Sequence, residues 1–445
     1  MVDMKKGKPI CGSEIEMDLL ATHTFGHKLS DTAVCIVIFT EYDLLEQQFT
    51  ALGKQTTKDF DVLIVAGYKS DDGTLSRMAK QSGLNCVIFK RKFNDGPAGG
   101  FYLAKRLAEE KGYLKMFMVE SDCLPVSPFL IEKASKLLDE YDVVNTISKS
   151  YDAKKYGKYN GITGGWRYTG LRSGIDVYPC PTFVFFAEDR YFSFQLASRK
   201  DLRVFIAQPG SGMEWSHPDF KKVEYFEQYI MPTPRQFIKN RIMCNNALFS
   251  QRASGFRAYL LECAGIYLLA HIWGFHFIIN GRLDGLKLFA QGFLDGITYN
   301  GGFCPEKVLT RKMEEVKESE IAKLHLEKPA YSNNAESYLK DFLESIKYLN
   351  KDVLMVPPLQ GIAKALLMSR SFYITVENQT FLAKQESRAQ TLLKILILPF
   401  YYLLLPVGFA FSFLVMFLST FIFRLDCMSV YRKMMANAAM EEKRK

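Results

Sequence analysis

Glu120 and Asp122 directly follow the apolar run 115–119 and precede Pro125. The run is typical of a buried strand, so both carboxylates are expected at its end, with Ser121 between them. Carboxylate oxygens suit Mg²⁺ and Mn²⁺, and such an ion can also bind diphosphate oxygens. The pair therefore predicts a divalent-metal site at which Ser121 contacts the ligand, although a solvated loop or a helix N-cap would use the same residues.

A second acidic pair, Glu188 and Asp189, lies between Phe186 and the aromatic residues 191–192. Apolar surroundings raise the pKa of a carboxyl group and make it a better general base. The pair therefore predicts a catalytic base at either position, with an exposed acidic pair as the alternative. His217, one of six histidines, is a candidate third metal ligand because a neutral imidazole can join two carboxylates.

Three further segments follow expected strands and are candidate donor-binding sites. The segment Asn94-Asp95-Gly96-Pro97-Ala98-Gly99-Gly100 opens an expected helix, where glycines allow close backbone approach and the helix N-terminus favours phosphate. Asn94, Gly96, Gly99 and Gly100 are therefore predicted to contact the donor. Thr40 and Tyr42 after the first strand, and Asp72 after the second, are predicted to contact the nucleoside.

The elements that must position these residues alternate at short spacing. Apolar runs predict strands over 33–39, 60–65, 85–89 and 115–119, and helices are expected over 44–52 and 101–111. This alternation indicates an α/β fold with an open, largely parallel sheet, and such sheets bind ligands beyond the carboxyl ends of their strands. Later strands are expected over 182–186 and 202–207.

The second half is expected to be mostly helical. A helical region begins near Pro234 and continues through 259–280, 286–294 and the charged segment 305–350. The stretch 259–280 contains Glu262, His271 and His276, so it is better interpreted as an interfacial or buried helix than as a membrane span. Domain boundaries are expected to give a catalytic domain over 30–235, a helical region over 236–390 and a hydrophobic segment with a basic tail over 391–445.

Residues 395–423 contain no charge, and about 20 apolar residues suffice to cross a bilayer. The segment therefore predicts membrane association, either as a span or as a re-entrant or in-plane helix broken near Pro406. Basic residues follow at Arg424, Arg432, Lys433 and 443–445, which favours contact with anionic lipids at a cytoplasmic face, with a solvated tail as the alternative.

Composition narrows the class of protein. The chain has 445 residues and a net charge of +9, and its basic residues are scattered, so no nucleic-acid partner is expected. Nine cysteines without a C-x-x-C pair favour reduced thiols, and the polar first 24 residues show no secretory signal. The sequence leaves open whether the chain forms a homo-oligomer.

In order along the chain, these segments resemble family-2 glycosyltransferases of the GT-A fold, in their rhamnosyl- and galactofuranosyltransferase-like branch. The similar segments are VCIVIFTEYDLLEQQFTALGKQT, FDVLIVAGYKSDDGT, FNDGPAGGFYLAKRLA, MVESDCLPVSP, FAEDRYFSFQLASRKDLRV, EWSHP, QFIKNR and LKLFAQGFLDGI. The resemblance covers roughly residues 30 to 300.

The resemblance implies an inverting, metal-dependent transfer of sugar from a nucleotide-diphosphate sugar to a glycan or lipid-linked acceptor. The resemblance also implies that Mn²⁺ or Mg²⁺ is bound by Glu120, Asp122 and His217. It further implies that Asp189 is the catalytic base. The chain departs from the family at Glu120, where aspartate is usual. It also departs at Ala66, where an acid usually contacts the nucleotide base, so UDP- and dTDP-sugars both remain candidate donors. A catalytically degenerate membrane scaffold and a sugar-phosphate nucleotidyltransferase are the alternatives.

Overall fold

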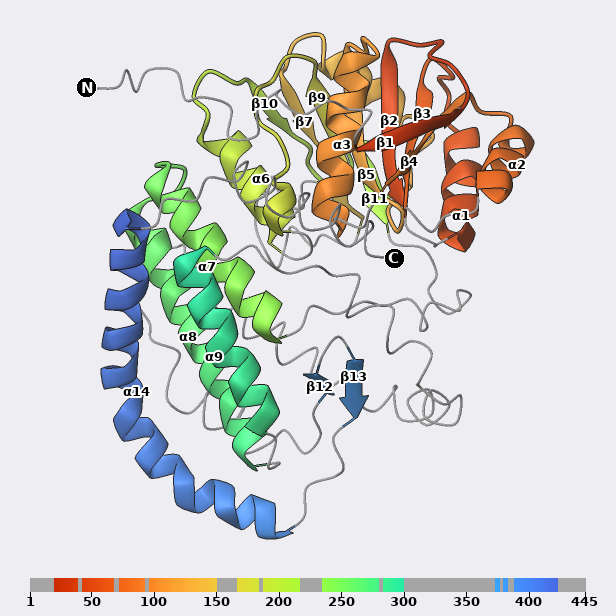
Figure 1. Cartoon of the computed structure of the whole chain (residues 1–445). Coiled ribbons are helices and arrows are strands. Elements are labelled where there is room, and N and C mark those ends of the chain that lie inside the picture. Colours follow the sequence, from red (N-terminus) through yellow and green to blue (C-terminus); the bar gives the residue numbers. More distant parts are fainter. Residues whose placement is uncertain are drawn as a thin grey trace. The chain divides into compact units, whose positions relative to one another are not determined.

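The computed structural model describes residues 20–38, 42–67, 72–92, 96–149, 166–183, 187–216, 234–279, 283–299, 373–376, 379–382 and 388–422. These residues belong to two compact units, the first containing the described chain up to Ser216 and the second the described chain from Pro234 onward (Figure 1). Each unit is described by itself.

The described part of the first unit is built on an eight-stranded sheet in the order β1-β4-β3-β2-β5-β9-β7-β10. Its strands are β1 (Ala21–Phe25), β2 (Thr32–Ile38), β3 (Asp61–Ala66), β4 (Cys86–Arg91), β5 (Lys115–Glu120), β7 (Val143–Asn145), β9 (Arg167–Arg172) and β10 (Val204–Ile206). The four strands β4, β3, β2 and β5 are parallel neighbours, whereas β1 and β9 run antiparallel to the strands beside them. The predicted α/β class is confirmed, with a sheet that is mixed outside its parallel centre.

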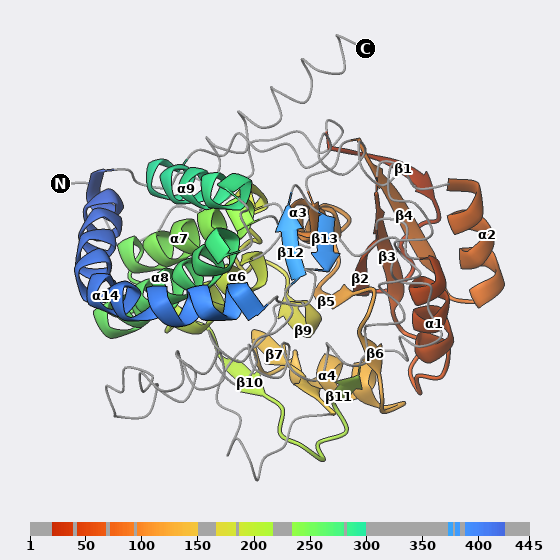
Figure 2. The same cartoon turned by 90° about the horizontal axis from the view of Figure 1, so that it is seen from below.

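Helices cover both faces of the parallel centre, which explains why the middle residues of its strands are apolar. Helices α1 (Tyr42–Gly53), α2 (Asp72–Ser82) and α4 (Leu130–Leu137) share a hydrophobic core with one face. Helix α3 (Gly96–Glu110) packs on the other face, against Val37 (Figure 2). All seven residues of β2 are buried.

The order of the parallel strands reverses direction at β2. Going outward from β2, the chain first adds β3 and β4 on one side and then returns to place β5 on the other. In open α/β sheets, a crevice forms at such a switch point, beyond the carboxyl ends of the two central strands. The topology therefore puts the carboxyl ends of β2 and β5 next to each other at the switch point.

One predicted strand differs from the structure, and the sheet contains a strand, β9, that was not predicted. The expected strand 182–186 is wrong over its described part, because Pro181–Phe183 form a 3-10 turn (η2). The proline ring fixes φ near the helical value and removes a backbone donor, which suits the first position of a helical turn. Strand β9 was not predicted, since its sequence RYTGLR lacks an apolar run.

A buried aspartate anchors the sheet at the amino ends of its parallel strands. The carboxylate of Asp61 accepts hydrogen bonds from the backbone N–H groups of Leu29 (2.8 Å) and Ser30 (3.2 Å). It also accepts from Asn85 Nδ2 (2.7 Å) and from the hydroxyl of Tyr113 (2.8 Å). Burial raises the pKa of the Tyr113 phenol, and the Asp61 carboxylate raises it further. Asp61 thus joins the loop before β2, the start of β3 and the chain before β4 and β5.

We expect Asp61→Ala to lower the free energy of unfolding by about 3 kcal/mol, because it leaves several buried donors without an acceptor. Urea denaturation followed by circular dichroism measures the change. Asp59→Ala is the matched control, since Asp59 is exposed and accepts from the Ser30 hydroxyl. Equal stability of the two variants would show that the Asp61 contacts contribute little.

The second unit consists mainly of helices. They are α7 (Pro234–Ser250), α8 (Phe256–Ile279), α9 (Leu283–Thr298) and α14 (Arg388–Ile422), with a hairpin of β12 (Tyr373–Val376) and β13 (Gln379–Leu382). Its described core includes Ile242 of α7, Cys263 of α8 and Met416 of α14. The predicted helical C-terminal region is therefore confirmed over these ranges, while 305–350 lies outside the described residues.

Polar contacts also join these helices. A buried ion pair links Arg241 of α7 to Glu262 of α8, with Nε and Oε1 2.8 Å apart. Arg235 pairs with Asp295 of α9 at 2.6 Å. Glu262 is buried in this pair, and the interfacial or buried helix expected over 259–280 stays a prediction. Within the described chain, no helix combines the length and apolarity needed to cross a membrane.

Candidate functional site

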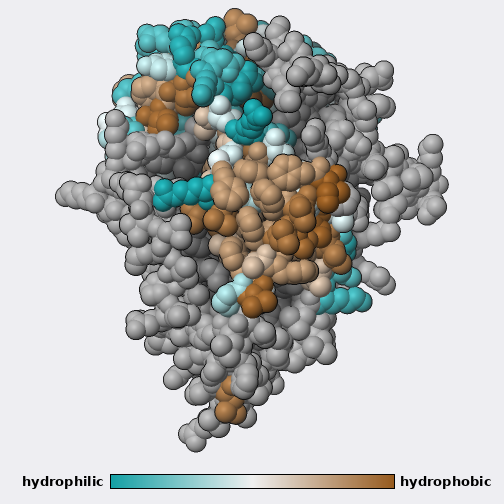
Figure 3. Space-filling model, turned by 90° about the vertical axis from the view of Figure 1, so that its left-hand side faces the viewer, coloured by the Kyte–Doolittle hydropathy of each residue, from teal (hydrophilic) through white to brown (hydrophobic). Residues whose placement is uncertain are grey.

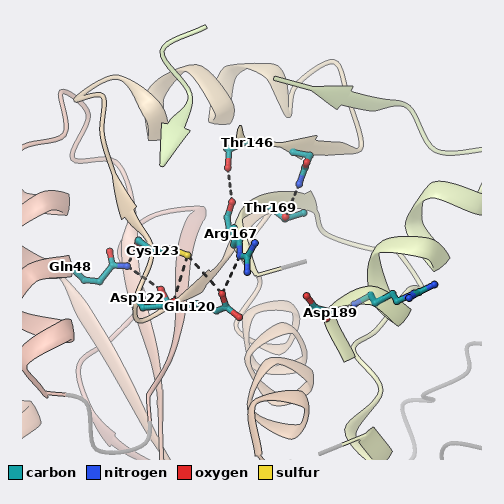
Figure 4. Close-up of polar contacts among 10 residues, drawn as sticks. Gln48, Glu120, Asp122, Cys123, Thr146, Arg167, Thr169 and Asp189 are labelled. Atoms are coloured by element: carbon teal, nitrogen blue, oxygen red, sulfur yellow. Dashed lines mark hydrogen bonds and ion pairs between the residues drawn. The ribbon is translucent and has the colours of Figure 1, made fainter. Parts of the chain in front are cut away.

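The predicted carboxylate pair lies at the switch point of the sheet. Glu120 ends β5, where its Cα pairs with that of Val37 near the end of β2. The backbone N–H of Glu120 donates to the carbonyl of Trp166 (2.7 Å), and the N–H of Cys123 donates to the Glu120 carbonyl (3.1 Å). The chain thus turns tightly over residues 120–123, which brings the carboxylates of Glu120 and Asp122 together (Figure 4).

Gln48 of α1 braces this turn from the side. Its amide nitrogen donates to the carbonyls of Glu120 (3.1 Å) and Cys123, and its amide oxygen accepts from the hydroxyl of Tyr168 on β9 (2.9 Å). Both Gln48 and Tyr168 are fully buried. The backbone of the turn is therefore fixed by two neighbouring elements, which allows the acidic side chains to bind a ligand without reorganising the loop.

Oxygen and sulfur atoms of Glu120, Asp122 and Cys123 lie within 4.8 Å of one another, close enough to share one cation. Burial and the two nearby carboxylates raise the pKa of the Cys123 thiol well above its ordinary value. In the absence of a bound cation the thiol is therefore protonated, and the two carboxylates are the oxygen donors of the cluster. Such an oxygen donor set fits Mg²⁺ or Mn²⁺ rather than a thiolate-bound metal.

Arg167 supplies positive charge beside this cluster. Its Nε lies 3.4 Å from Glu120 Oε2, and its guanidinium lies 5.2 Å from the centre of the Trp215 ring. Partial removal from water raises the pKa of Glu120, and the charges of Asp122 and Asp189 raise it further, whereas Arg167 opposes them. Two carboxylates thus lie together, and the charge of a third, Asp189, also acts on Glu120, which is an arrangement that attracts cations.

The second acidic pair separates into two environments. Both residues begin α6 (Glu188–Ser198), but Glu188 is 6% exposed and Asp189 is half-buried. Figure 4 shows Asp189 across from Glu120 and Arg167, on the other side of the site. The preceding residue, Ala187, has a left-handed φ of 71°, which is strained for a residue with a side chain and sharpens the entry into α6.

A stack of aromatic rings positions α6 against the rest of the site. Phe101 of α3 stacks on Trp166 with ring centres 4.3 Å apart, and Trp166 stacks on Phe192 of α6 at 4.9 Å. The backbone carbonyl of Trp166 also accepts a hydrogen bond from the Glu120 N–H, so Trp166 contacts both the carboxylate turn and α6. The stack therefore links the position of the predicted base to the position of the predicted metal site.

The glycine-rich segment places the start of α3 close to the same strand ends. Gly96 has φ of 70°, and its carbonyl accepts from a guanidinium nitrogen of Arg91 at the end of β4 (2.6 Å). A Cβ added at Gly100 would lie 2.4 Å from a methyl carbon of Val37, so only glycine allows this approach to β2. Gly99 and Gly100 are buried against the sheet.

Other predicted residues are located only in part. Tyr42 begins α1 after β2 and Asp72 begins α2 after β3, so both lie beyond the carboxyl ends of strands. Thr40, Asn94 and His217 lie outside the described residues. Strand β11 (Glu214–Ser216) ends just before position 217 and pairs with β6 (Leu124–Pro125), with Ser216 opposite Leu124.

The residues that the sequence did not suggest are mostly positioning residues. Gln48, Trp166, Arg167 and Tyr168 contact the carboxylate turn or its neighbours, but they come from α1 and β9 or the residue just before it. The contacts of Trp166, Arg167 and Tyr168 depend on the pairing of β9 with β5, which no local pattern shows. One available signal was the rarity of tryptophan, of which the chain has 3.

No protein-family model and no curated protein matches this chain. Among solved structures, fragment 1–349 of S. aureus TarS in complex with UDP-GlcNAc is similar, with 16% identity over 61% of this chain and 81% of that one and a TM-score of 0.45. The mannosyltransferase PcManGT from Pyrobaculum calidifontis, in complex with GDP-Man and Mn²⁺, has 13% identity over 78% of this chain and 90% of that one, with a TM-score of 0.40.

A 4-diphosphocytidyl-2C-methyl-D-erythritolsynthase from Anaerococcus prevotii is also similar, at 11% identity over 41% of this chain and 89% of that one, with a TM-score of 0.28. The function proposed for this chain therefore rests on the geometry of its own site.

Proposed function

We propose that this chain is an inverting, metal-dependent glycosyltransferase of family 2, in the rhamnosyl- and galactofuranosyltransferase-like branch, that uses a nucleotide-diphosphate sugar. One observation carries the proposal. The carboxylate turn 120–123 lies at the switch point of a doubly wound sheet, where nucleotides bind, and a third carboxylate, Asp189, lies across from it. Separate carboxylates for a cation and for a proton are what an inverting, metal-dependent transfer of sugar from a diphosphate uses.

The residues of the chain have distinct roles in this proposal. Asp189 accepts the proton of an acceptor hydroxyl, whose oxygen attacks the anomeric carbon from the face opposite the diphosphate. Tyr42 and Asp72 contact the nucleoside, and the start of α3 lies near the diphosphate, where backbone N–H groups favour anions. Arg167 adds positive charge where the leaving diphosphate develops negative charge.

Glu120 and Asp122 would hold Mg²⁺ or Mn²⁺, with His217 as the third ligand, and a bound ion would neutralise charge on the leaving diphosphate. The acceptor is a hydroxyl of a glycan or of a lipid-linked glycan. Ala66 ends β3, where an acid would contact the nucleotide base in relatives, so UDP- and dTDP-sugars are both candidate donors.

A nucleotidyltransferase would need a basic, glycine-rich loop after the first central strand to bind triphosphate, but that place holds Thr40-Glu41-Tyr42. A non-catalytic scaffold would need neither a cation site nor a facing carboxylate. Release of nucleoside diphosphate separates all three functions, because a nucleotidyltransferase releases pyrophosphate from a nucleoside triphosphate and a scaffold releases nothing.

The test is a panel of nucleotide sugars with purified full-length chain and Mn²⁺, assayed for nucleoside diphosphate. UDP-GlcNAc and GDP-Man, together with UDP- and dTDP-linked hexoses, form the first panel. We expect release from one donor that stops when the metal is removed with EDTA. No release and no donor binding by calorimetry would overturn the proposal in favour of the scaffold.

We expect Arg167→Met to raise the KM for the donor by roughly tenfold, because it removes a charge that can bind the diphosphate and that offsets the crowded carboxylates. Arg167→Lys should recover part of the loss. Arg172→Met is the matched control, since Arg172 lies on the same strand and is paired with Asp142 away from the site. A donor KM unchanged in Arg167→Met would remove Arg167 from the proposed site.

A further inference from the structure

The outward face of α14 is apolar, although α14 belongs to a helical unit whose other contacts are partly polar. We define the apolar face of α14 as the residues Val407, Phe411, Leu414, Leu418, Phe421 and Ile422. Each is between 47% and 69% exposed. Their spacing of three or four residues puts them along one side of the helix, and Figure 3 shows apolar side chains gathered on this side.

The rotation of α14 about its axis is fixed by contacts on its other side. Asn246 of α7 donates to the hydroxyl of Ser419 (2.9 Å), and the hydroxyls of Tyr259 and Thr420 lie 3.3 Å apart. Met416, one turn before these residues, is 1% exposed in the core of the unit. The apolar face therefore cannot turn inward without breaking buried hydrogen bonds.

The surroundings of this face are basic. Phe256 at the start of α8 is 53% exposed and contacts Phe413 and Phe417 of α14, with ring centres 6.3 Å apart in both cases. Arg252 and Arg257, just before and after Phe256, are exposed. Two exposed arginines therefore flank, in the sequence, an apolar side chain that contacts α14.

Acidic residues are scarce in the same helices. Helices α7 and α8 contain a single acid, Glu262, and its carboxylate is buried and paired with Arg241. Helix α14 contains Arg388 and Lys394 and no acid, and Arg424 follows it in the sequence. Basic residues therefore outnumber acids in the helices that carry and border the apolar face.

We propose that the apolar face of α14 docks on the surface of a bilayer that contains anionic lipids, with the helix lying in the plane of the interface. An apolar stripe with basic flanks matches acyl chains below and phosphate head groups beside it. A second copy of the chain would bring the same positive charge to the contact and would be repelled. This proposal does not depend on the proposed enzymatic function.

The test is flotation of the full-length chain, synthesised in a cell-free system with vesicles of phosphatidylcholine alone or with added phosphatidylglycerol. We expect the chain to float with the anionic vesicles, less so at high salt. The double variant Phe411→Glu/Leu418→Glu should lower the ratio of bound to free chain by about tenfold or more, because it places charge in the apolar contact. The matched control is Leu29→Glu/Leu114→Glu, two exposed leucines of the first unit, and should float like the unchanged chain.

A second measurement does not depend on a disruptive change. Phe411→Trp places a fluorophore on the apolar face, and brominated acyl chains should quench its emission in anionic vesicles. Flotation that is equal in the double variant and the control would overturn the proposal, as would emission from the Phe411→Trp variant that brominated lipids leave unquenched. A third outcome would overturn it in favour of a second copy: the unchanged chain binds no vesicles and forms dimers, and the double variant is monomeric.

Discussion

The variant Asp189→Asn is expected to transfer sugar about 10²- to 10⁴-fold more slowly, since the amide cannot accept the proton of the attacking hydroxyl. Asp189 lies across from the carboxylate turn and is half-buried, so the amide keeps the shape of the site. Donor binding should therefore change little. The substitution should lower the rate constant for transfer, which is measured from initial rates at saturating donor. The Kd for the donor is measured by calorimetry.

Two comparisons make this prediction specific. Asp201→Asn removes an acid of the same unit that is exposed and paired with Arg199, and it should leave transfer unchanged. Glu188→Gln alters the other member of the acidic pair, which is buried, and any effect should come with lower stability. Transfer that survives Asp189→Asn but is abolished in a stable Glu188→Gln variant would assign the base to Glu188 instead.

The second large effect is expected from Asp122→Ala, which removes one of the two carboxylates of the turn. We expect the affinity for Mn²⁺ to fall by at least about 100-fold, because loss of a direct ligand should exceed the effect of losing an outer contact. Metal-dependent transfer should fall with it. Titration of Mn²⁺ followed by electron paramagnetic resonance measures the binding without any need for turnover.

Cys123→Ser is the matched control for Asp122→Ala. The thiol is buried beside both carboxylates, and Mn²⁺ prefers their oxygen atoms to sulfur, so a hydroxyl should replace it with Mn²⁺ affinity unchanged within about threefold. Loss of Mn²⁺ binding in Cys123→Ser would show that sulfur is a ligand and that the site prefers a softer metal. Binding retained in Asp122→Ala would place the cation elsewhere.

The sequence predicted the parallel centre of the sheet because its strands are continuous apolar runs. The run 115–119 is an example, and β5 occupies Lys115–Glu120. Strand β9 escaped prediction because Arg167, Gly170 and Arg172 interrupt its pattern, and its place in the sheet comes from pairing with β5 and β7. Local hydrophobicity does not show such pairing.

The same physical limit applies to the site. Glu120 and Asp122 could be found because they follow a recognisable strand, and the structure brings them together as expected. Gln48 and Arg167 reach the turn from distant segments, so their roles depend on tertiary contacts rather than on spacing along the chain. Whether Asp189 is the base stays a prediction, and so does the role of His217 as a ligand.

The anchoring carboxylate of Asp61 and the acidic turn 120–123 lie at opposite ends of the parallel strands. Contacts that hold the sheet together are therefore separate from contacts that meet a ligand. Because distant substitutions have nearly additive effects on stability, loops at the carboxyl ends can diverge with little penalty to folding. During evolution, or in a mutant library, this chain should exchange one ligand preference for another more readily than it tolerates change around Asp61.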